Sequence, residues 1–299
     1  MRGVLWMILA CAGLFVTACA HRPGVTARHT VTDEGRKLAY RLFTPAQAPR
    51  DGVPLVVALH RFADNADRMA AITGFDAIAE REGFAVVYPE GAQRRFDFMS
   101  STRDDVRAIL AVIDDVRARV RVDESRLYVT GASNGGFMTY ALISAAPERF
   151  AAAAPVMALM PEAFVREDQP AVPLLVVYGA ANTIVPPDAT ALGPVPTLTT
   201  RDAVAYWREA NGCLNDVVRT RLPAAAPADG TRTTRRAWSD ALGEERVVVY
   251  TVAGGGHTWP GGTEPSPRFI VGPLARDWSA SEVIWKFFQR FDRSRTVGP

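Results

Sequence analysis

Residues 127–136 (LYVTGASNGG) hold the pattern that decides the fold. An apolar run typical of a buried strand leads through Gly131 to Ser133, and small residues with helical period begin at Gly135. This is a G-x-S-x-G pattern between a strand and a helix, where a strained turn pushes a serine oxygen out of a sheet. Glycine is needed because such a turn brings neighbouring backbone very close. The pattern predicts Ser133 as a nucleophile and the backbone amide of Asn134 as a donor to an oxyanion.

Short apolar runs bounded by turn residues recur on both sides of this stretch, as in parallel strands that are buried on both faces. They are residues 55–59, 84–88, 151–156, 174–178 and 247–250. Segments with helical period alternate with them: residues 66–82, 103–119, 135–146, 200–211 and 279–291. This alternation predicts an α/β fold with a mostly parallel central sheet and helices on both faces.

The remaining segments complete this organisation. Residues 25–31 and 37–43 alternate as an N-terminal antiparallel hairpin. Residues 184–196 and 222–236 indicate surface insertions, because strand and helix patterns resume after each. We find no internal repeat in the sequence, so residues 25–293 are predicted to form a single catalytic domain.

Composition fits an ordinary globular protein. The chain has 299 residues, 48% of them hydrophobic, which is enough for one large core. Its 34 basic and 32 acidic residues are spread along the sequence and give a formal net charge of +2. Without a basic stripe the sequence argues against nucleic acid as a partner.

The first 19 residues are typical of an export signal. Met1-Arg2 is followed by an uncharged apolar run that is too short to span a bilayer comfortably. The run ends in Val16-Thr17-Ala18-Cys19, which resembles a bacterial lipobox and predicts acylation of Cys19 as a lipid anchor. A plain signal peptide cut near Ala18 or Ala20 is the alternative. Both interpretations predict export. The protein is then a lipoprotein of the cell envelope, at the outer membrane or in the periplasm, or it is secreted.

Of the three cysteines, only Cys213 lies outside the signal region, so an internal disulfide is not expected in the mature chain. No histidine adjoins Cys213, and we interpret it as a structural thiol. The base is expected in a loop after the last strand, because triads on such folds run in the order serine, acid, histidine. Residues 247–257 end in three glycines and His257, which we predict to be the general base.

The chain resembles the polyhydroxybutyrate depolymerase and feruloyl esterase group of α/β-hydrolases. The resemblance covers nearly all of the mature chain, and the run GGHTWPGG at residues 255–262 is its most specific part. It extends to residues 53–60, 73–76, 83–89, 131–136, 205–208, 211–213 and 280–285. The resemblance implies the α/β-hydrolase fold and hydrolysis of carboxylic esters without a cofactor. The predicted anchor indicates small or oligomeric esters as substrates, and we expect no metal site.

Two departures from the group bear on activity. The first follows residues 174–178, where related chains carry Gly-Thr-x-Asp and this chain has Gly179-Ala180-Ala181-Asn182. The carbonyl of Asn182 is able to accept the His257 N–H and hold its tautomer, whereas an amide turned the other way enforces the wrong tautomer. Asp188, later on the same loop, is a possible substitute acid, although a solvated carboxylate is the simpler interpretation.

The second departure follows His60, which we expect to hold the adjoining loop by hydrogen bonds. Related chains continue with a glycine-rich turn, but here the residues are Arg61-Phe62-Ala63-Asp64. Three hypotheses follow: the second oxyanion amide comes from Arg61 or Phe62, the oxyanion hole is lost, or the Arg61 guanidinium meets an acidic group of the substrate.

The leading hypothesis from sequence is a serine esterase with Ser133 as nucleophile and His257 as base. A peptidase or an acetylxylan esterase shares the same serine turn and stays open as an alternative. The rival from another class is a catalytically impaired relative that binds an ester, polymer or protein ligand at the envelope.

Overall fold

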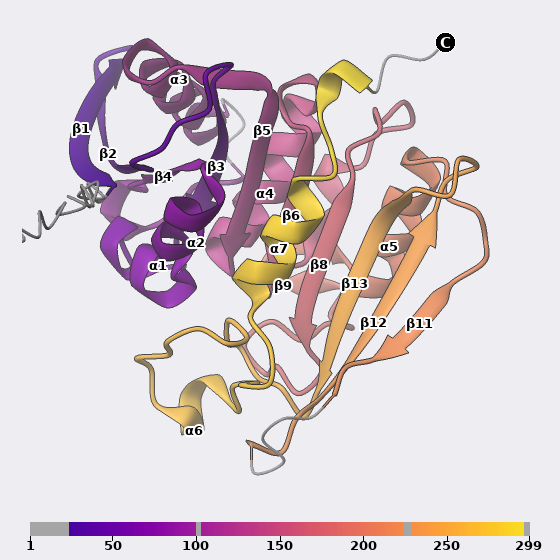
Figure 1. Ribbon diagram of the computed structural model, residues 1–299. Helices are drawn as coiled ribbons and strands as arrows, with labels where there is room; N and C mark the ends of the chain where they lie inside the picture. Colours follow the sequence, from indigo (N-terminus) through magenta and orange to yellow (C-terminus); the bar gives the residue numbers. More distant parts are fainter. Residues whose placement is uncertain (1–23, 100–102, 224–228, 296–299) are drawn as a thin grey trace, which may run out of the picture.

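The computed structural model describes residues 24–99, 103–223 and 229–295. A mixed sheet of ten strands forms the centre, in the order β1-β2-β4-β3-β5-β6-β8-β13-β12-β11 (Figure 1). Six adjacent strands in the middle are parallel: β4 (Ala85–Pro89), β3 (Val53–Leu59), β5 (Val122–Ala132), β6 (Ala152–Val156), β8 (Leu174–Gly179) and β13 (Glu245–Ala253). The predicted α/β fold with a mostly parallel sheet is confirmed.

Antiparallel strands close both edges of this sheet. The hairpin of β1 (Val25–Asp33) and β2 (Arg36–Thr44) lies at one edge, as the sequence predicts. The other edge is formed by β12 (Arg232–Ser239) and β11 (Val218–Arg221). Part of the predicted insertion at residues 222–236 is therefore wrong, because β12 begins at Arg232 and pairs with β13. The other insertion carries β9 (Ala191–Leu192) and β10 (Val195–Leu198), which join β7 (Met160–Pro161) in a small second sheet.

Helices cover both faces of the large sheet and bury two hydrophobic cores. One core lies under α3 (Asp104–Arg119), α4 (Asn134–Ala145) and α5 (Thr200–Ala210), and the other under α1 (Ala66–Thr73), α2 (Phe75–Glu82) and α7 (Ala280–Phe288). Along β3 successive side chains alternate between the two cores, with Val57 in the first and Val56 in the second. Burial of both faces accounts for the continuous apolar runs of the sequence.

One predicted helix is interrupted. Residues 66–82 form α1 and α2 instead of a single helix, because Gly74 between them has φ 62° and cannot continue the helical path. The shorter helical elements are α6 (Arg268–Val271), η1 (Ala92–Arg94), η2 (Pro147–Arg149), η3 (Glu162–Phe164) and η5 (Arg293–Arg295).

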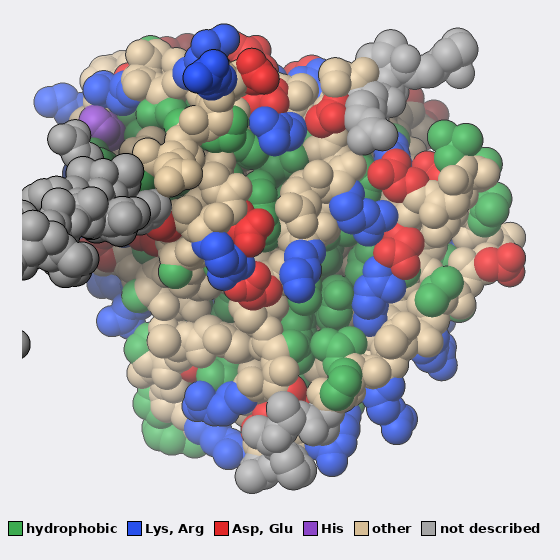
Figure 2. Space-filling model, viewed as in Figure 1, with side chains coloured by type: hydrophobic (Ala, Val, Ile, Leu, Met, Phe, Trp, Pro, Cys, Tyr) green, Lys and Arg blue, Asp and Glu red, His purple; other side chains and the backbone are tan. Residues whose placement is uncertain are grey.

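The surface carries mixed charge. On the face seen in Figure 2, Lys and Arg side chains are interspersed with Asp and Glu. Among the described residues, no helix is both long enough and apolar enough to cross a bilayer. The predicted signal and the anchor at Cys19 lie outside the described residues.

Candidate active site

Ser133 lies at a strained corner between β5 and α4. Its backbone has φ 53° and ψ −119°, and its side chain makes no capping hydrogen bond to the helix that it begins. The flanking glycines are required by close approach: a Cβ on Gly131 would lie 2.2 Å from the carbonyl oxygen of Gly135, and one on Gly135 would lie 2.2 Å from that of Leu59. Non-glycine residues with positive φ are uncommon and concentrate at functional sites. The corner thus has the geometry that the sequence pattern predicts.

Asn134 fixes the position of the helix start. Its side-chain amide forms two hydrogen bonds with the backbone of Phe96: Oδ1 accepts from the amide at 2.7 Å, and Nδ2 donates to the carbonyl at 2.9 Å. As the first residue of α4, Asn134 has a backbone amide with no acceptor inside the helix. Its role as an oxyanion donor stays a prediction.

His257 lies on the loop that follows β13, at the edge of the sheet where the parallel strands end. Its backbone amide donates to the carbonyl of Val271 at 2.5 Å, and its side chain is buried. The preceding Gly256 packs against the same segment, where a Cβ would lie 2.0 Å from the Val271 oxygen. Two residues on, the buried Trp259 donates its indole N–H to Ser281 at 3.0 Å and so ties the loop to α7. The histidine is therefore held on a packed loop.

Asn182 contacts the predicted base directly, and the orientation of its amide decides the chemistry. Asn182 Nδ2 lies 3.0 Å from His257 Nδ1. The oxygen, Oδ1, accepts hydrogen bonds from the backbone amides of Ile184 and Val185, both at 3.0 Å. Exchanging the two amide atoms would aim the NH₂ group at these two donors, so the backbone fixes the orientation. The NH₂ group therefore donates to Nδ1, and neutral His257 carries its proton on Nε2.

This is the tautomer that opposes proton transfer from serine. A base that takes the Ser133 proton needs its lone pair on Nε2 and its own proton on Nδ1. The imidazolium is disfavoured as well: burial, together with the positive charge of Arg61, lowers the pKa of His257 from 6.5 to about 4. Among the described residues, no carboxylate forms a hydrogen bond with this ring. Asp188 is exposed, on the surface of the same loop.

The loop after β3 is held by a buried ion network. The Arg61 guanidinium donates to Asp64 at 2.7 Å and to Glu264 at 2.8 Å, and all three side chains are less than a tenth exposed. The hypothesis that Arg61 presents its guanidinium to an acidic substrate is therefore wrong, because both pairs turn it inward. The Phe62 side chain is exposed. An oxyanion role for the backbone amide of Arg61 or Phe62 stays a prediction.

His60 has the expected structural role. Its Nε2 accepts from the Gly91 amide at 2.9 Å, so its Nδ1 carries the proton and donates to the Arg61 carbonyl at 2.7 Å. Burial lowers the pKa of His60, with the hydrogen bond to Arg61 opposing the shift. Cys213 is half-buried, and burial raises the pKa of its thiol, as expected for a structural cysteine.

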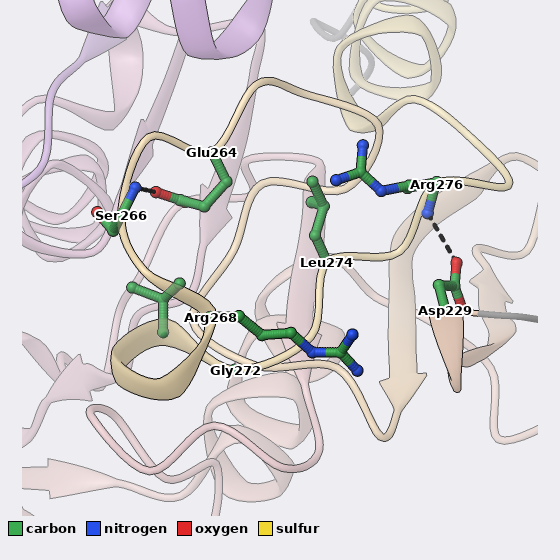
Figure 3. Close-up of a pocket in the computed structure, with 8 residues that line it drawn as sticks. Asp229, Glu264, Ser266, Arg268, Gly272, Leu274 and Arg276 are labelled. Atoms are coloured by element: carbon green, nitrogen blue, oxygen red, sulfur yellow. Dashed lines mark hydrogen bonds between the residues drawn. The ribbon is translucent and has the colours of Figure 1, made fainter.

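A cavity of about 310 Å³ lies beside the His257 loop (Figure 3). Leu274 lies between the side chains of Arg268 and Arg276, with Glu264 on one side and Asp229 on the other. Val271, whose carbonyl holds the His257 amide, lines the same cavity. Within the described part of the chain, no group of three or more His, Cys, Asp or Glu side chains is placed to hold a metal ion.

Sequence reasoning missed two contributors to this site. Glu264 pairs with Arg61 across 203 positions, a separation at which no local pattern joins them. The backbone amides of Ile184 and Val185 set the orientation of Asn182, although their side chains give no sign of it. The available signal was Arg61 itself, which stands where related chains have a glycine-rich turn. An arginine that is buried there requires an acidic partner elsewhere in the chain.

Comparison with known proteins agrees with this geometry. A family model described as esterase PHB depolymerase matches residues 38–164. A protein named putative esterase NocK, from Nocardia uniformis subsp. tsuyamanensis, is 35% identical over 284 residues, covering 88% of this chain and 82% of that protein. Poly(3-hydroxyalkanoate) depolymerase C of Paucimonas lemoignei is 34% identical over 113 residues, which are 34% of this chain and 27% of the depolymerase.

Solved structures support the fold. An acetyl xylan esterase from Aspergillus awamori matches with a TM-score of 0.59 and 16% identity, covering 78% of this chain and 94% of that one. A thermostable esterase matches with a TM-score of 0.58 and 18% identity, covering 90% of this chain and 63% of that one. The sequence relatives show that the chain belongs to the polyhydroxybutyrate depolymerase family of esterases, which are carboxylic ester hydrolases, and the solved structures show its α/β-hydrolase fold.

Proposed function

We propose that this protein is a slow serine esterase that hydrolyses carboxylic esters through an acyl-enzyme on Ser133. The observation that carries the proposal is the strained Ser133 corner at the start of α4. Family membership adds that the substrates are carboxylic esters. The Asn182 side chain accounts for the proposed slowness.

In the first step Ser133 Oγ attacks the ester carbonyl carbon while its proton passes to His257 Nε2. The carbonyl oxygen becomes an oxyanion, which the Asn134 amide and one amide from Arg61 or Phe62 stabilise. Collapse breaks the bond to the alcohol, which leaves with the proton from His257. Water then attacks the acyl-enzyme by the same route and releases the acid.

Asn182 makes both proton transfers costly. His257 must first move its proton to Nδ1, where it faces the Asn182 NH₂ group, and the imidazolium then has no carboxylate partner. In a serine protease the equivalent change lowers kcat by about 10⁴. An ester leaves more readily than an amide, so we propose that activity persists on esters and not on peptides. The cavity lined by Val271, which contacts the His257 loop, is proposed to hold part of the ester.

Hydrolysis of p-nitrophenyl acetate and butyrate by the purified chain and by Ser133→Ala tests this proposal. Turnover that Ser133→Ala abolishes would establish the serine mechanism. Equal turnover in both proteins would show that Ser133 is not the nucleophile. No turnover in either protein would contradict esterase activity on these two esters.

A second candidate function has a specific observation in its favour. The amide orientation of Asn182 puts a donor where the catalytic mechanism needs an acceptor. We propose as the alternative a catalytically impaired esterase relative that binds a ligand. Asn182→Asp distinguishes the two candidate functions. A slow esterase is expected to gain turnover from this substitution, whereas a binding protein whose other catalytic groups have also decayed is expected to gain none.

We further propose that the protein acts in the cell envelope, anchored through lipid on Cys19. A tethered esterase of this kind acts on small or oligomeric esters that diffuse to it. Metabolic labelling with a palmitate analogue, in the chain and in Cys19→Ser, tests the anchor. Label that persists in Cys19→Ser would contradict it.

A further inference from the structure

The Asn182 contact turns His257 into a hydrogen-bond donor at the proposed reaction centre. Because Asn182 Nδ2 donates to Nδ1, the proton of the neutral ring is on Nε2. Ser133 contributes a hydroxyl that makes no capping hydrogen bond, and Asn134 contributes a backbone amide at the start of α4. Each of these groups has a proton to donate.

The loop after β3 connects the elements that carry these groups. The serine corner packs on the end of β3, since Gly135 approaches the carbonyl oxygens of Leu59 and His60. Arg61 follows directly and donates a hydrogen bond to Glu264, on the segment that follows His257. The loop after β3 therefore links the serine corner to the segment that carries His257.

We propose that the resting site is a receptor for a carboxylate anion, which accepts hydrogen bonds from Ser133 Oγ, His257 Nε2 and the Asn134 amide. The identity of the anion rests on the proposed function, because we take the anion to be the free acid that ester hydrolysis releases. An ionised carboxylate is acceptor-only, and its hydrogen bonds are among the strong ones. Three donors suit it better than they suit a neutral ester, whose carbonyl oxygen carries no full charge.

The neutral side chain at position 182 favours the same ligand, because Asn182 brings no negative charge to the ring. Among the described residues, no carboxylate is bonded to the ring itself. With aspartate at position 182, a negative charge would repel an anion bound on the other side of the ring.

Proton uptake distinguishes the two arrangements. With a pKa of about 4, His257 stays neutral at and above pH 5.5 and already donates from Nε2, so the anion binds without a proton. In Asn182→Asp the neutral ring donates from Nδ1 to the new carboxylate. It must then gain a proton before Nε2 donates to the ligand, so binding becomes linked to proton uptake.

Isothermal titration calorimetry of the full-length chain tests the proposal with butyrate, 3-hydroxybutyrate and ferulate. We expect at least one acid to bind without proton uptake at pH 8, measured in two buffers that differ in ionisation enthalpy. Asn182→Asp is expected to weaken this binding by about tenfold or more, the scale of a lost charge-assisted hydrogen bond. Its matched control is Asn215→Asp, which adds the same charge at an exposed position and is expected to change nothing.

Butyramide provides a second measurement that needs no variant, because it has the shape of butyrate without the charge. We expect any acid that binds to do so at least about tenfold more tightly than its amide. Absence of binding by all three acids, equal binding in Asn182→Asp, equal binding of acid and amide, or one proton taken up per anion by the wild-type chain would each overturn the proposal. Turnover of p-nitrophenyl butyrate, measured in the same preparations, reports separately on the proposed function.

Discussion

Asn134 and Asn182 are two asparagines of one site, and the backbone uses them in opposite ways. Both atoms of the Asn134 side-chain amide form hydrogen bonds with the backbone of Phe96, so only an amide fits there. Asn182 accepts hydrogen bonds from two backbone amides through its oxygen and directs its NH₂ group toward His257. A carboxylate would satisfy the same two donors and still offer an oxygen to the ring. The amide group is therefore structural at position 134 and decides the chemistry at position 182.

Asn182→Asp is expected to have the largest effect of the substitutions at these asparagines. We expect kcat on p-nitrophenyl butyrate to rise by about 10² to 10⁴, because the carboxylate restores the Nδ1–H tautomer and stabilises the imidazolium. Steady-state kinetics with Asn215→Asp as the charge control measures the gain. An unchanged kcat would favour the ligand-binding alternative, in which other parts of the site, such as the loop after β3, have also decayed.

The free energy of unfolding is expected to depend on pH through His257. The pKa of His257 is lowered to about 4 in the folded protein, so the unfolded chain binds more protons between that pH and 6.5. Stability from this residue is fully present above pH 6.5 and is lost as pH falls toward 4, by about 3 kcal/mol in all.

Urea unfolding at pH 7, 5.5 and 4.5 measures this loss against His257→Gln, which has no ring to titrate. Asn182→Asp is expected to lose less stability over the same range, since a carboxylate beside the ring raises the pKa of His257. Identical pH profiles in all three proteins would show that the buried ring does not titrate as described.

Asn134→Asp is predicted to act in the opposite direction from Asn182→Asp. It removes the donor to the Phe96 carbonyl and places a negative charge beside the developing oxyanion. We expect the free energy of unfolding to fall by about 1 to 3 kcal/mol and kcat to fall by about tenfold or more. Denaturation and kinetics on the same preparation check both. A gain in kcat would contradict the proposed oxyanion role of this turn.

The smallest effect is expected at a third asparagine, Asn65. Its Oδ1 caps α1 by accepting from the Arg68 amide at 2.9 Å, a role that aspartate fills equally well. Asn65→Asp is predicted to change stability by less than about 0.5 kcal/mol and to leave kcat unchanged. A large change in either quantity would show that charge near this end of the site acts over a longer range than the contacts indicate.

The sequence predicted what backbone pattern and spacing determine. The order of buried strands, the corner at Ser133 and the position of Asn182 after β8 all follow from runs of local residues. The strand β12 was missed because its first five residues are all Thr or Arg and show no apolar alternation, although Thr233 is buried. The break at Gly74 was missed because apolar residues on both sides kept a helical period.

Side-chain orientation was the part that sequence did not determine. The sequence allows two orientations of the Asn182 side-chain amide. The backbone amides of Ile184 and Val185 select one of them, and residue types alone do not predict the geometry of that turn. The partner of Arg61 was not predicted either, because Glu264 lies 203 positions later in the sequence and meets Arg61 only in the folded chain. Both are long-range or backbone effects, which local patterns do not encode.

The two backbone amides that hold Asn182 Oδ1 also bear on how this site changes over evolutionary time. Asparagine and aspartate codons differ only at their first nucleotide, and the turn at residues 182–185 offers its donors equally to either side chain. The chain is therefore a single point mutation from the acid-bearing form, and no backbone rearrangement separates the two.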